Sequence, residues 1–585
     1  LGTDDRKHPV LGRRIVASKR AGLVVAAKAK GAKWRDELVT ELVAQTKRLQ
    51  AGDTQAIGVI VNRVATARKV AELLRAPLQK ALDAARAEPD TEKRQAMEAE
   101  ARAKAPDIIL LTGRMRPVDR DAIMEKLQPM LSNSPKAIDR PTFVVATQTI
   151  EVGADLDFHA LVTECASLDA LRQRFGRLNR VAARDKAGAV IVVRADQTEP
   201  AKDDAHADPV YGNSLAKTWQ WLTERAKDVP VEQVVAAAES GEGKRKSKGA
   251  RGKKAAASGT PASASAARVI DFGVEAMETL TKSMTPDDLA ALIAPAPDAA
   301  VLLPAHLDMW CQTSPRPVPD PGPAYFLHGP QRGEPEVQVV FRADLGDDAD
   351  QWAEIVSLCP PSSSEALSVR LRDFRRWLAL QSPDERSGDV EGERISDEHE
   401  DSQERSAHAT RRTLRWRGPD SRETGVIDST AAITPFDTYV IPITSDDQRS
   451  AAALLGDFPA DPRGTPCITD AGDEAFQTSR DKAILRLRHD LYPALHASFD
   501  MLDPETIDAD DTAATVDEAL AALKKQLETA PVESLRRALD DLGSRRHRTM
   551  KRHPLGGIVL IGTRRLHQFD PTFVEPEESC ESSSD

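Results

Sequence analysis

Short apolar runs recur along residues 57–193, and helical stretches lie between them. The runs cover residues 57–61, 108–111, 143–146, 160–163 and 189–193. Runs of this length without polar alternation are typical of strands in a sheet that is covered on both faces. Because strand and helix alternate, the pattern predicts an α/β fold with a doubly wound parallel sheet.

Polar side chains stand directly after the run at residues 143–146, where Thr147 and Gln148 follow. In open α/β sheets, ligands bind at the carboxyl ends of the strands. The order therefore predicts hydroxyl and amide groups at the ligand-binding edge of the sheet.

A cationic helix follows the run at residues 160–163. Ser167 is a suitable N-cap, and Asp169 lies in the first turn. Gln173, Arg177 and Arg180 are spaced four and then three apart, so all three should share one helix face. Guanidinium groups offer planar forks of donors that match phosphate oxygens, so this face predicts an anion site.

Residues 144–180 closely resemble motifs V and VI of superfamily 2 helicases. The pattern Gln-Arg-x-Gly-Arg-x-x-Arg at residues 173–180 is specific to that superfamily, and residues 146–158 most resemble the CRISPR-associated helicase-nuclease of type I interference systems. The resemblance implies a RecA-like lobe that works with ATP and Mg²⁺. It implies that Gln173 contacts the γ-phosphate and that Arg177 and Arg180 act as arginine fingers.

The same resemblance implies further contacts. Asp155 would sense the ribose or couple ATP to DNA, and Gly153 and Arg174 would border the cofactor. The tracked single-stranded DNA would be held by residues that follow strands: Thr147, Gln148, Arg114, Asn62 and Thr66. The implied partner is a CRISPR guide-RNA surveillance complex in the cytoplasm.

The sequence contains neither a Gly-x-x-x-x-Gly-Lys-Ser/Thr loop nor an Asp-Glu pair after a strand. Since the family carries both on a preceding lobe, we expect this chain to be the second lobe with everything after it, inactive towards ATP alone. The second-lobe motifs do not separate DNA from RNA, so an RNA or DNA-repair helicase stays open. A noncatalytic half that docks on another subunit also stays open.

The expected domain plan follows shifts in composition. It has a helical lead-in (1–56), the RecA-like lobe (57–200), a helix with a basic flexible linker (201–268), a smaller α+β accessory domain (269–575) with an acidic loop (383–410), and a tail (576–585). Trp34 begins the apolar spacing of a lead-in helix, and residues 76–104 indicate a long solvated helix or an insertion. Trp219 and Trp221 lie on a helix expected to pack on the lobe.

In the accessory region, residues 302–310, 313–323 and 325–329 resemble the type I-U subtype, whose nuclease domain would follow Asp585. Strands are predicted at residues 336–341 and 436–441, the second after a turn where the resemblance implies glycine but Phe436 stands. Helices are predicted at residues 481–500 and 516–542.

No metal site is predicted. His489 and Asp490 lie on a predicted amphipathic helix without the partners of a His-Asp nuclease, and His306 and His328 have no acidic partner at ligand spacing.

The amino-acid composition limits the kinds of molecule that the chain can bind. A formal net charge of −12 argues against coating of nucleic acid by the whole surface, so a local groove must grip any polyanion. The 5 cysteines are scattered, which fits a reducing compartment rather than a disulfide framework. No run approaches the roughly 20 apolar residues that span a bilayer.

Overall fold

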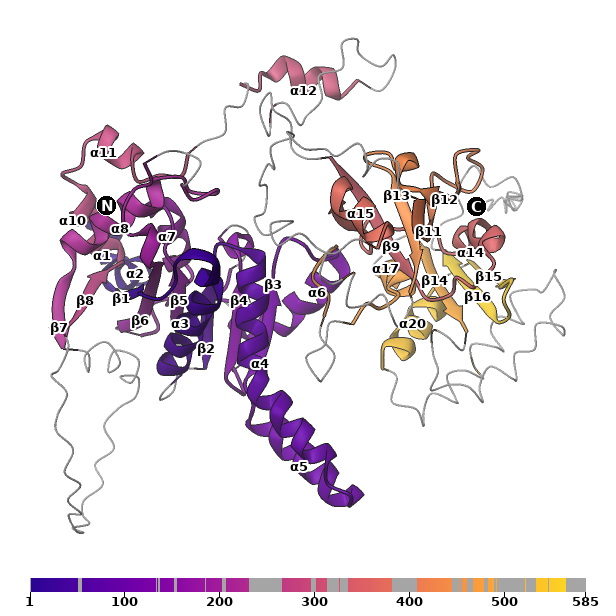
Figure 1. The fold of residues 1–585 in the computed structure, drawn as a ribbon, viewed down its shortest axis with the longest axis horizontal. Helices are drawn as coiled ribbons and strands as arrows, with labels where there is room; N and C mark the ends of the chain where they lie inside the picture. The colour runs from indigo at the N-terminus through magenta and orange to yellow at the C-terminus, as the bar shows by residue number, and fades with distance from the viewer. Residues whose placement is uncertain are drawn as a thin grey trace, which may run out of the picture.

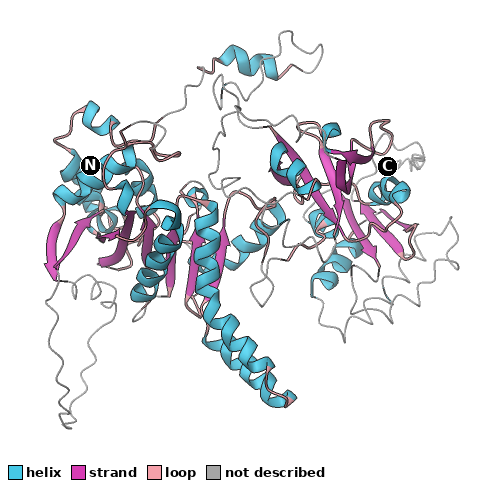
Figure 2. Ribbon diagram, viewed as in Figure 1, coloured by secondary structure: helices cyan, strands magenta, loops and turns pink. Residues whose placement is uncertain are grey.

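The computed structural model (Figures 1 and 2) covers residues 1–585. The residues it describes are 2–50, 55–132, 134, 137–151, 155–184, 186–202, 207–230, 266–295, 301–312, 326, 335–380, 408–443, 451, 455–459, 467–477, 482–488, 491, 521, 533–545 and 547–563.

The amino-terminal half is built on an 8-stranded sheet. In sheet order, its strands are β3 (Asp107–Leu111), β4 (Thr142–Ala146), β2 (Ala56–Ile60), β5 (Ala160–Glu164), β6 (Lys186–Arg194), β1 (Ser18–Ala26), β8 (Ala266–Asp271) and β7 (Lys227–Pro230). The strands from β3 to β1 pair in parallel, whereas β8 and β7 run antiparallel to their neighbours. The predicted RecA-like parallel sheet is thus confirmed.

Helices cover both faces of this sheet, because alternate strand residues are apolar on both sides. The helical elements of this half are α1 (Thr3–Lys7), α2 (Leu11–Val16), η1 (Gly31–Lys33), α3 (Trp34–Leu49), α4 (Val64–Arg86), α5 (Thr91–Lys104), α6 (Pro117–Lys126), η2 (Gln128–Met130), η3 (Gln148–Ile150), α7 (Leu168–Phe175), η4 (Ala195–Gln197), α8 (Ser214–Arg225), α10 (Val274–Thr281), α11 (Pro286–Ala290) and α12 (Pro304–Trp310). α3 and α4 form one apolar core with the sheet, and α6, α7 and α8 form the other. Trp219 and Trp221 of α8 are buried, as predicted.

Two sequence predictions for this half need correction. The helical lead-in contains β1, which is a central strand because it pairs with both β6 and β8. The stretch at residues 76–104 is two helices, since the side chain of Asp90 accepts from the backbone N–H groups of Glu92 and Lys93 and starts α5. α5 lies along the far end of α4, away from the sheet (Figure 1).

The predicted basic linker lies mostly outside the described residues, but its two ends do not. β7 ends at Pro230, β8 begins at Ala266, and these two residues are register partners in an antiparallel pair. Residues 231–265 therefore leave and rejoin the same edge of the sheet. The prediction of a connection between two domains is corrected to an excursion within one sheet.

The carboxyl-terminal half contains two further sheets. Their strands, in sheet order, are β10 (Leu367–Arg370), β9 (Glu336–Arg342), β13 (Thr438–Pro442), β11 (His408–Trp416) and β12 (Gly425–Ser429), and then β14 (Lys482–Leu487), β16 (Ile558–Thr563) and β15 (His547–Arg552). Its helical elements are η6 (Ala349–Gln351), α14 (Trp352–Leu358), α15 (Leu371–Leu378), η8 (Thr430–Ala432), α17 (Gly472–Gln477) and α20 (Glu533–Gly543).

Here the sequence predictions succeed in part. β9 and β13 confirm the two predicted strands, and α20 overlaps the end of the second predicted helix. β14 falls where a helix was predicted, so that prediction is wrong for residues 482–487, which pair with β16. Phe436 has a φ of 65°, which is the left-handed conformation that glycine adopts most easily. Its side chain is exposed. The acidic loop lies almost entirely outside the described residues.

None of the helices that the structure describes is both long enough and apolar enough to cross a membrane.

Candidate functional site

The candidate site lies at the carboxyl edge of the large sheet, where β2, β4 and β5 end side by side. α7 follows β5 and places Arg174 over these ends. The Arg174 side chain is 0% exposed. This buried arginine organises the interior of the site.

Each of the five N–H groups of the Arg174 guanidinium has an acceptor. Nε donates to Glu151 at 2.8 Å. Nη1 donates to the hydroxyl of Thr163 at 2.9 Å and to the carbonyl of Glu164 at 3.0 Å. Nη2 donates to Asn62 Oδ1 and to the Tyr211 hydroxyl, both at 2.9 Å. The expectation that Arg174 borders a cofactor is therefore corrected, because its donors are all used inside the protein.

Asn62 belongs to the same interior network. Its Nδ2 donates to the carbonyl of Cys165 at 2.7 Å, and its backbone N–H donates to Glu164 at 2.9 Å. Burial raises the pKa of the Glu164 carboxyl. Gln148 closes the network by donating from Nε2 to the Asn62 carbonyl at 3.0 Å.

The predicted nucleic-acid contacts near this network are not on the surface. Asn62 is 2% exposed, and Thr66 and Thr147 are 0% exposed. In this conformation these three side chains are buried, and their role as nucleic-acid contacts stays a prediction. Gln148 is half-buried at the start of η3.

The outer rim of the site carries Gln173, Arg177 and Arg180. The predicted continuous helix through all three is wrong, because α7 ends at Phe175 and Gly176 is its C-cap. Beyond it the chain turns and pairs with Phe158, whose N–H donates to the carbonyl of Arg177 at 2.8 Å. Gln173 is exposed on the last turn of α7.

Arg177 is half-buried and lies against η3. Its Nε donates to the carbonyl of Ile150 at 3.2 Å, and its Nη2 donates to the carbonyl of Glu151 at 2.9 Å. Burial, and then the nearby Arg180, lower the pKa of Arg177. Since both acceptors are neutral carbonyls, the positive charge of Arg177 is not cancelled by an ion pair among the described residues.

Arg180 forms an ion pair with Asp155, and both side chains are substantially exposed. The Ser132 hydroxyl donates to Asp155 at 2.5 Å and, with Arg180, lowers the pKa of that carboxyl. The backbone N–H of Arg180 also donates to Asp157 at 2.6 Å. The structure thus brings Asp155 and Arg180 together, while Gly153 lies outside the described residues.

The side chain of Arg114 is 12% exposed. Its Nη2 donates to the carbonyl of Leu455 at 2.9 Å, and the Asp373 carboxylate is 3.7 Å away. Burial lowers the pKa of Arg114. The predicted phosphate contact is therefore covered, in this conformation, by the carboxyl-terminal half.

The described residues contain no group of three or more His, Cys, Asp or Glu side chains that could hold a metal ion. His306 contacts the Phe326 and Trp310 rings. His328, His489 and Asp490 lie outside the part of the chain that the structure describes.

Sequence reasoning missed three residues of the site and its border. Glu151 lies within residues 146–158, which carry the resemblance to the family, and Tyr211 lies further along the chain. Both side chains accept hydrogen bonds from Arg174. Arg68 lies on α4, four positions after Val64, and contacts the carboxyl-terminal half. A basic residue one turn into the helix after a strand was the available signal.

A parallel sheet with an arginine-rich rim after its strands gives the class of the fold, which is a RecA-like α/β lobe with its ligand edge at the carboxyl ends of the strands. Within that class, residues 53–183 match the family model Cas3-like_C_2, described as CRISPR-associated nuclease/helicase Cas3, C-terminal. This segment, which includes the rim, is therefore similar to the carboxyl-terminal part of that family. No curated protein matches the chain.

Solved structures with similarity to the chain include two whose titles name Cas3. "Crystal structure of T. fusca Cas3-ATP" is 20% identical with a TM-score of 0.23, covering 35% of this chain and 20% of that one. "Crystal structure of T. fusca Cas3" is 14% identical with a TM-score of 0.31, covering 78% and 42%. "CRISPR RNA-guided surveillance complex, pre-nicking" is 16% identical with a TM-score of 0.31, covering 78% and 44%. The chain thus spans less than half of each solved chain.

Proposed function

We propose that this chain supplies the second motor lobe and carboxyl-terminal region of an ATP-dependent DNA helicase of CRISPR type I interference. The observation that carries the proposal is the rim of Gln173, Arg177 and Arg180, which lies inside the segment that matches the family model. Its donors suit an anionic phosphate chain presented by a preceding lobe.

Each rim residue would have a separate role in ATP hydrolysis. Gln173, exposed at the end of α7, would contact the γ-phosphate. Arg177 would leave the two neutral carbonyls that hold it, and Arg180 would leave Asp155, to stabilise charge on the phosphoryl group. Asp155 would then be free to report nucleotide occupancy to the rest of the lobe.

ATP with Mg²⁺ would be held mainly by the preceding lobe, whose phosphate loop this sequence lacks. The interior network around Arg174 would keep the rim in register with the carboxyl ends of the strands. The proposed clients are single-stranded DNA and a guide-RNA surveillance complex, in the cytoplasm.

The test is ATP turnover in the polypeptide that joins this chain to a first lobe. Arg177→Ala should lower turnover by about 10³-fold or more while leaving the fold intact. Arg172→Ala, a change at an exposed position of the same helix, should leave turnover unchanged. Near-normal turnover in Arg177→Ala would contradict the proposal. Stimulation by RNA but not DNA would identify an RNA helicase instead.

A further inference from the structure

A carboxylate from the carboxyl-terminal half is held at the carboxyl end of β3. The side chain of Asp457 is 4% exposed. Its Oδ2 accepts from the Thr112 hydroxyl at 2.5 Å, and its Oδ1 accepts from Nε of Arg68. These partners belong to the lobe and lie hundreds of positions away in the sequence. The contact therefore joins the two halves of the chain.

The backbone around Asp457 is fitted to the same place. Its N–H donates to the carbonyl of Arg114 at 2.8 Å, and the carbonyl of Leu455 accepts from Arg114 Nη2. A Cβ on Gly456 would meet the Arg114 carbonyl at 2.8 Å and the Leu367 side chain at 2.6 Å. Only glycine allows this approach, so the segment at residues 455–457 is built to lie against the end of β3.

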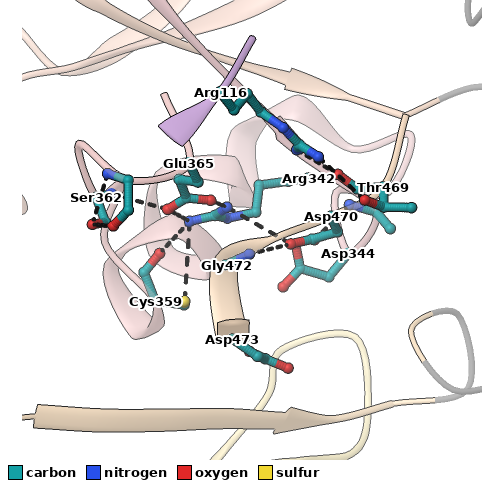
Figure 3. A network of polar contacts seen from close by, with 12 residues as sticks. Arg116, Arg342, Asp344, Cys359, Ser362, Glu365, Thr469, Asp470, Gly472 and Asp473 are labelled. Carbon is teal, nitrogen blue, oxygen red and sulfur yellow. Dashed lines mark hydrogen bonds and ion pairs between the residues drawn. The ribbon is translucent and has the colours of Figure 1, made fainter. Parts of the chain in front are cut away.

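Two further hydrogen bonds join the amino-terminal half of the chain to the carboxyl-terminal half. Arg116 donates from Nη1 to the carbonyl of Thr469 at 2.7 Å, as Figure 3 shows, and the N–H of Val118 donates to the carbonyl of Ser364 at 2.8 Å. The interface thus extends across the whole segment between β3 and α6.

The partners of Asp457 are donors that also suit a phosphate. A threonine hydroxyl and a guanidinium N–H converge on two oxygens that share one negative charge, at the strand end where α/β sheets bind ligands. Arg114 adds a second guanidinium on the other side of the segment. A phosphodiester offers the same charge and the same pair of acceptor oxygens as the carboxylate.

We propose that Arg68, Thr112 and Arg114 form a binding site for a phosphate of a single nucleic-acid strand, and that Asp457 occupies this site as an internal competitor. The inference rests on the proposed function, which brings a single strand to this edge of the lobe. Binding of the strand displaces Asp457 and separates the segment at residues 455–457 from β3. The site is therefore covered until nucleic acid competes for it.

The charges around Asp457 favour its replacement by a phosphate over its removal alone. Asp457 pairs with Arg68, and the Asp373 carboxylate lies 3.7 Å from Arg114, so each of these two guanidinium groups faces a carboxylate in the closed contact. Removal of the aspartate without a replacement would take a carboxylate away from Arg68 and Thr112, a cost that a phosphate offsets. The overall charge of −12 makes such a local cationic site necessary for any grip on a polyanion.

The test measures the affinity of the chain for fluorescein-labelled dT20 by fluorescence anisotropy at fixed salt. Asp457→Asn keeps the shape of the side chain but removes its charge, and it should lower the Kd about tenfold. Arg68→Ala in the same background should abolish that gain. Asp437→Asn is the matched control, because Asp437 is a buried partner of Arg417 within the carboxyl-terminal half, and it should leave the Kd unchanged.

An unchanged or higher Kd in Asp457→Asn would overturn the internal competitor while leaving the proposed function intact. Failure of the wild type and all variants to bind dT20 would overturn both. If only a labelled rU20 binds, the DNA assignment fails, and the effect of Asp457→Asn on rU20 decides the competitor.

A second measurement needs no variant. The Asp457 amide is protected by its bond to the Arg114 carbonyl, so saturating dT20 should speed hydrogen exchange at residues 455–457 in the wild type. Unchanged or slower exchange there, with dT20 bound, would overturn the proposal.

Discussion

Nη2 of Arg174 donates to Oδ1 of Asn62 at 2.9 Å in the interior beneath α7. Arg174 is 0% exposed and Asn62 is 2% exposed, so the bond forms away from water. It fixes α7 to the carboxyl end of β2. Since Arg177 follows directly after α7, this interior bond sets where the rim cations stand.

Replacement of Arg174 should lower the stability of the lobe. Arg174→Met leaves Glu151 and Asn62 without their donors, and Glu164 loses a nearby positive charge. We expect the free energy of unfolding to fall by about 3–5 kcal/mol, as measured by urea denaturation. Arg172→Met on the exposed side of α7 should change it by less than about 0.5 kcal/mol. Equal stabilities of the two variants would show that the network contributes little.

His159 should make stability depend on pH. Its Nδ1 accepts from the N–H groups of Gln55 and Ala56, and burial, together with Arg184, lowers the pKa to about 4 from an ordinary 6.5. The unfolded chain therefore takes up the proton first, and the contribution of neutral His159 is lost as pH falls from 6.5 towards 4.

His159→Asn keeps an acceptor in place of Nδ1 but cannot titrate. Between pH 7 and pH 4.5, the variant should lose roughly 2 kcal/mol less of its free energy of unfolding than the wild type, with allowance for partial exposure. Chemical denaturation at each pH measures this. The assignment fails if His159→Asn follows the wild type at every pH.

Gly58 in β2 should not tolerate a methyl group. A Cβ there would meet the ring of Phe158 at 2.8 Å, and Phe158 is 0% exposed. Gly58→Ala should cost about 1–3 kcal/mol of unfolding free energy through overpacking. Adding Phe158→Leu should recover part of the loss, whereas Gly425→Ala, with no atom near its added Cβ, gives the baseline. A neutral Gly58→Ala would mean that the ring moves without cost.

Arg486 should hold the carboxyl-terminal sheets together. From β14 it donates to Asp344, Asp470 and Asp473 at 2.8, 2.6 and 2.8 Å. Figure 3 labels these three aspartates. Arg486→Met leaves these carboxylates facing one another, a loss of about 3–5 kcal/mol.

Calorimetry and limited proteolysis would measure that loss. Arg486→Met should lower the melting temperature of the carboxyl-terminal half and open it to protease before the lobe. Arg412→Met, at an exposed position of β11, is the control. Cleavage patterns that do not distinguish the two variants would contradict the prediction.

The sequence predicts most of the large sheet because five of its strands are continuous apolar runs. Such a run favours a strand that is buried on both faces, and local sequence is enough to recognise it. It predicts β1 poorly, since Ser18–Ala26 contains Lys19 and Arg20 and becomes a strand only through pairing with β6 and β8. β14 fails for a similar reason. Its apolar positions fit a helix or a strand, and only β16 decides.

At the candidate site, residue types are predictable and exposure is not. A polar side chain after a strand can face a ligand or an interior partner, and Tyr211, far along the chain, turns Arg174 inward. Similarly, Arg114 follows a strand as a phosphate contact would, but Leu455 covers it. Contacts between distant segments decide both cases, and local pattern does not record them.

The pairing of Pro230 with Ala266 has a consequence for the basic run that begins at Lys244. The described ends of residues 231–265 lie side by side as register partners, so a shorter stretch of chain could still join β7 to β8. We therefore expect removal of the basic run to leave the pairing of β7 with β8 intact.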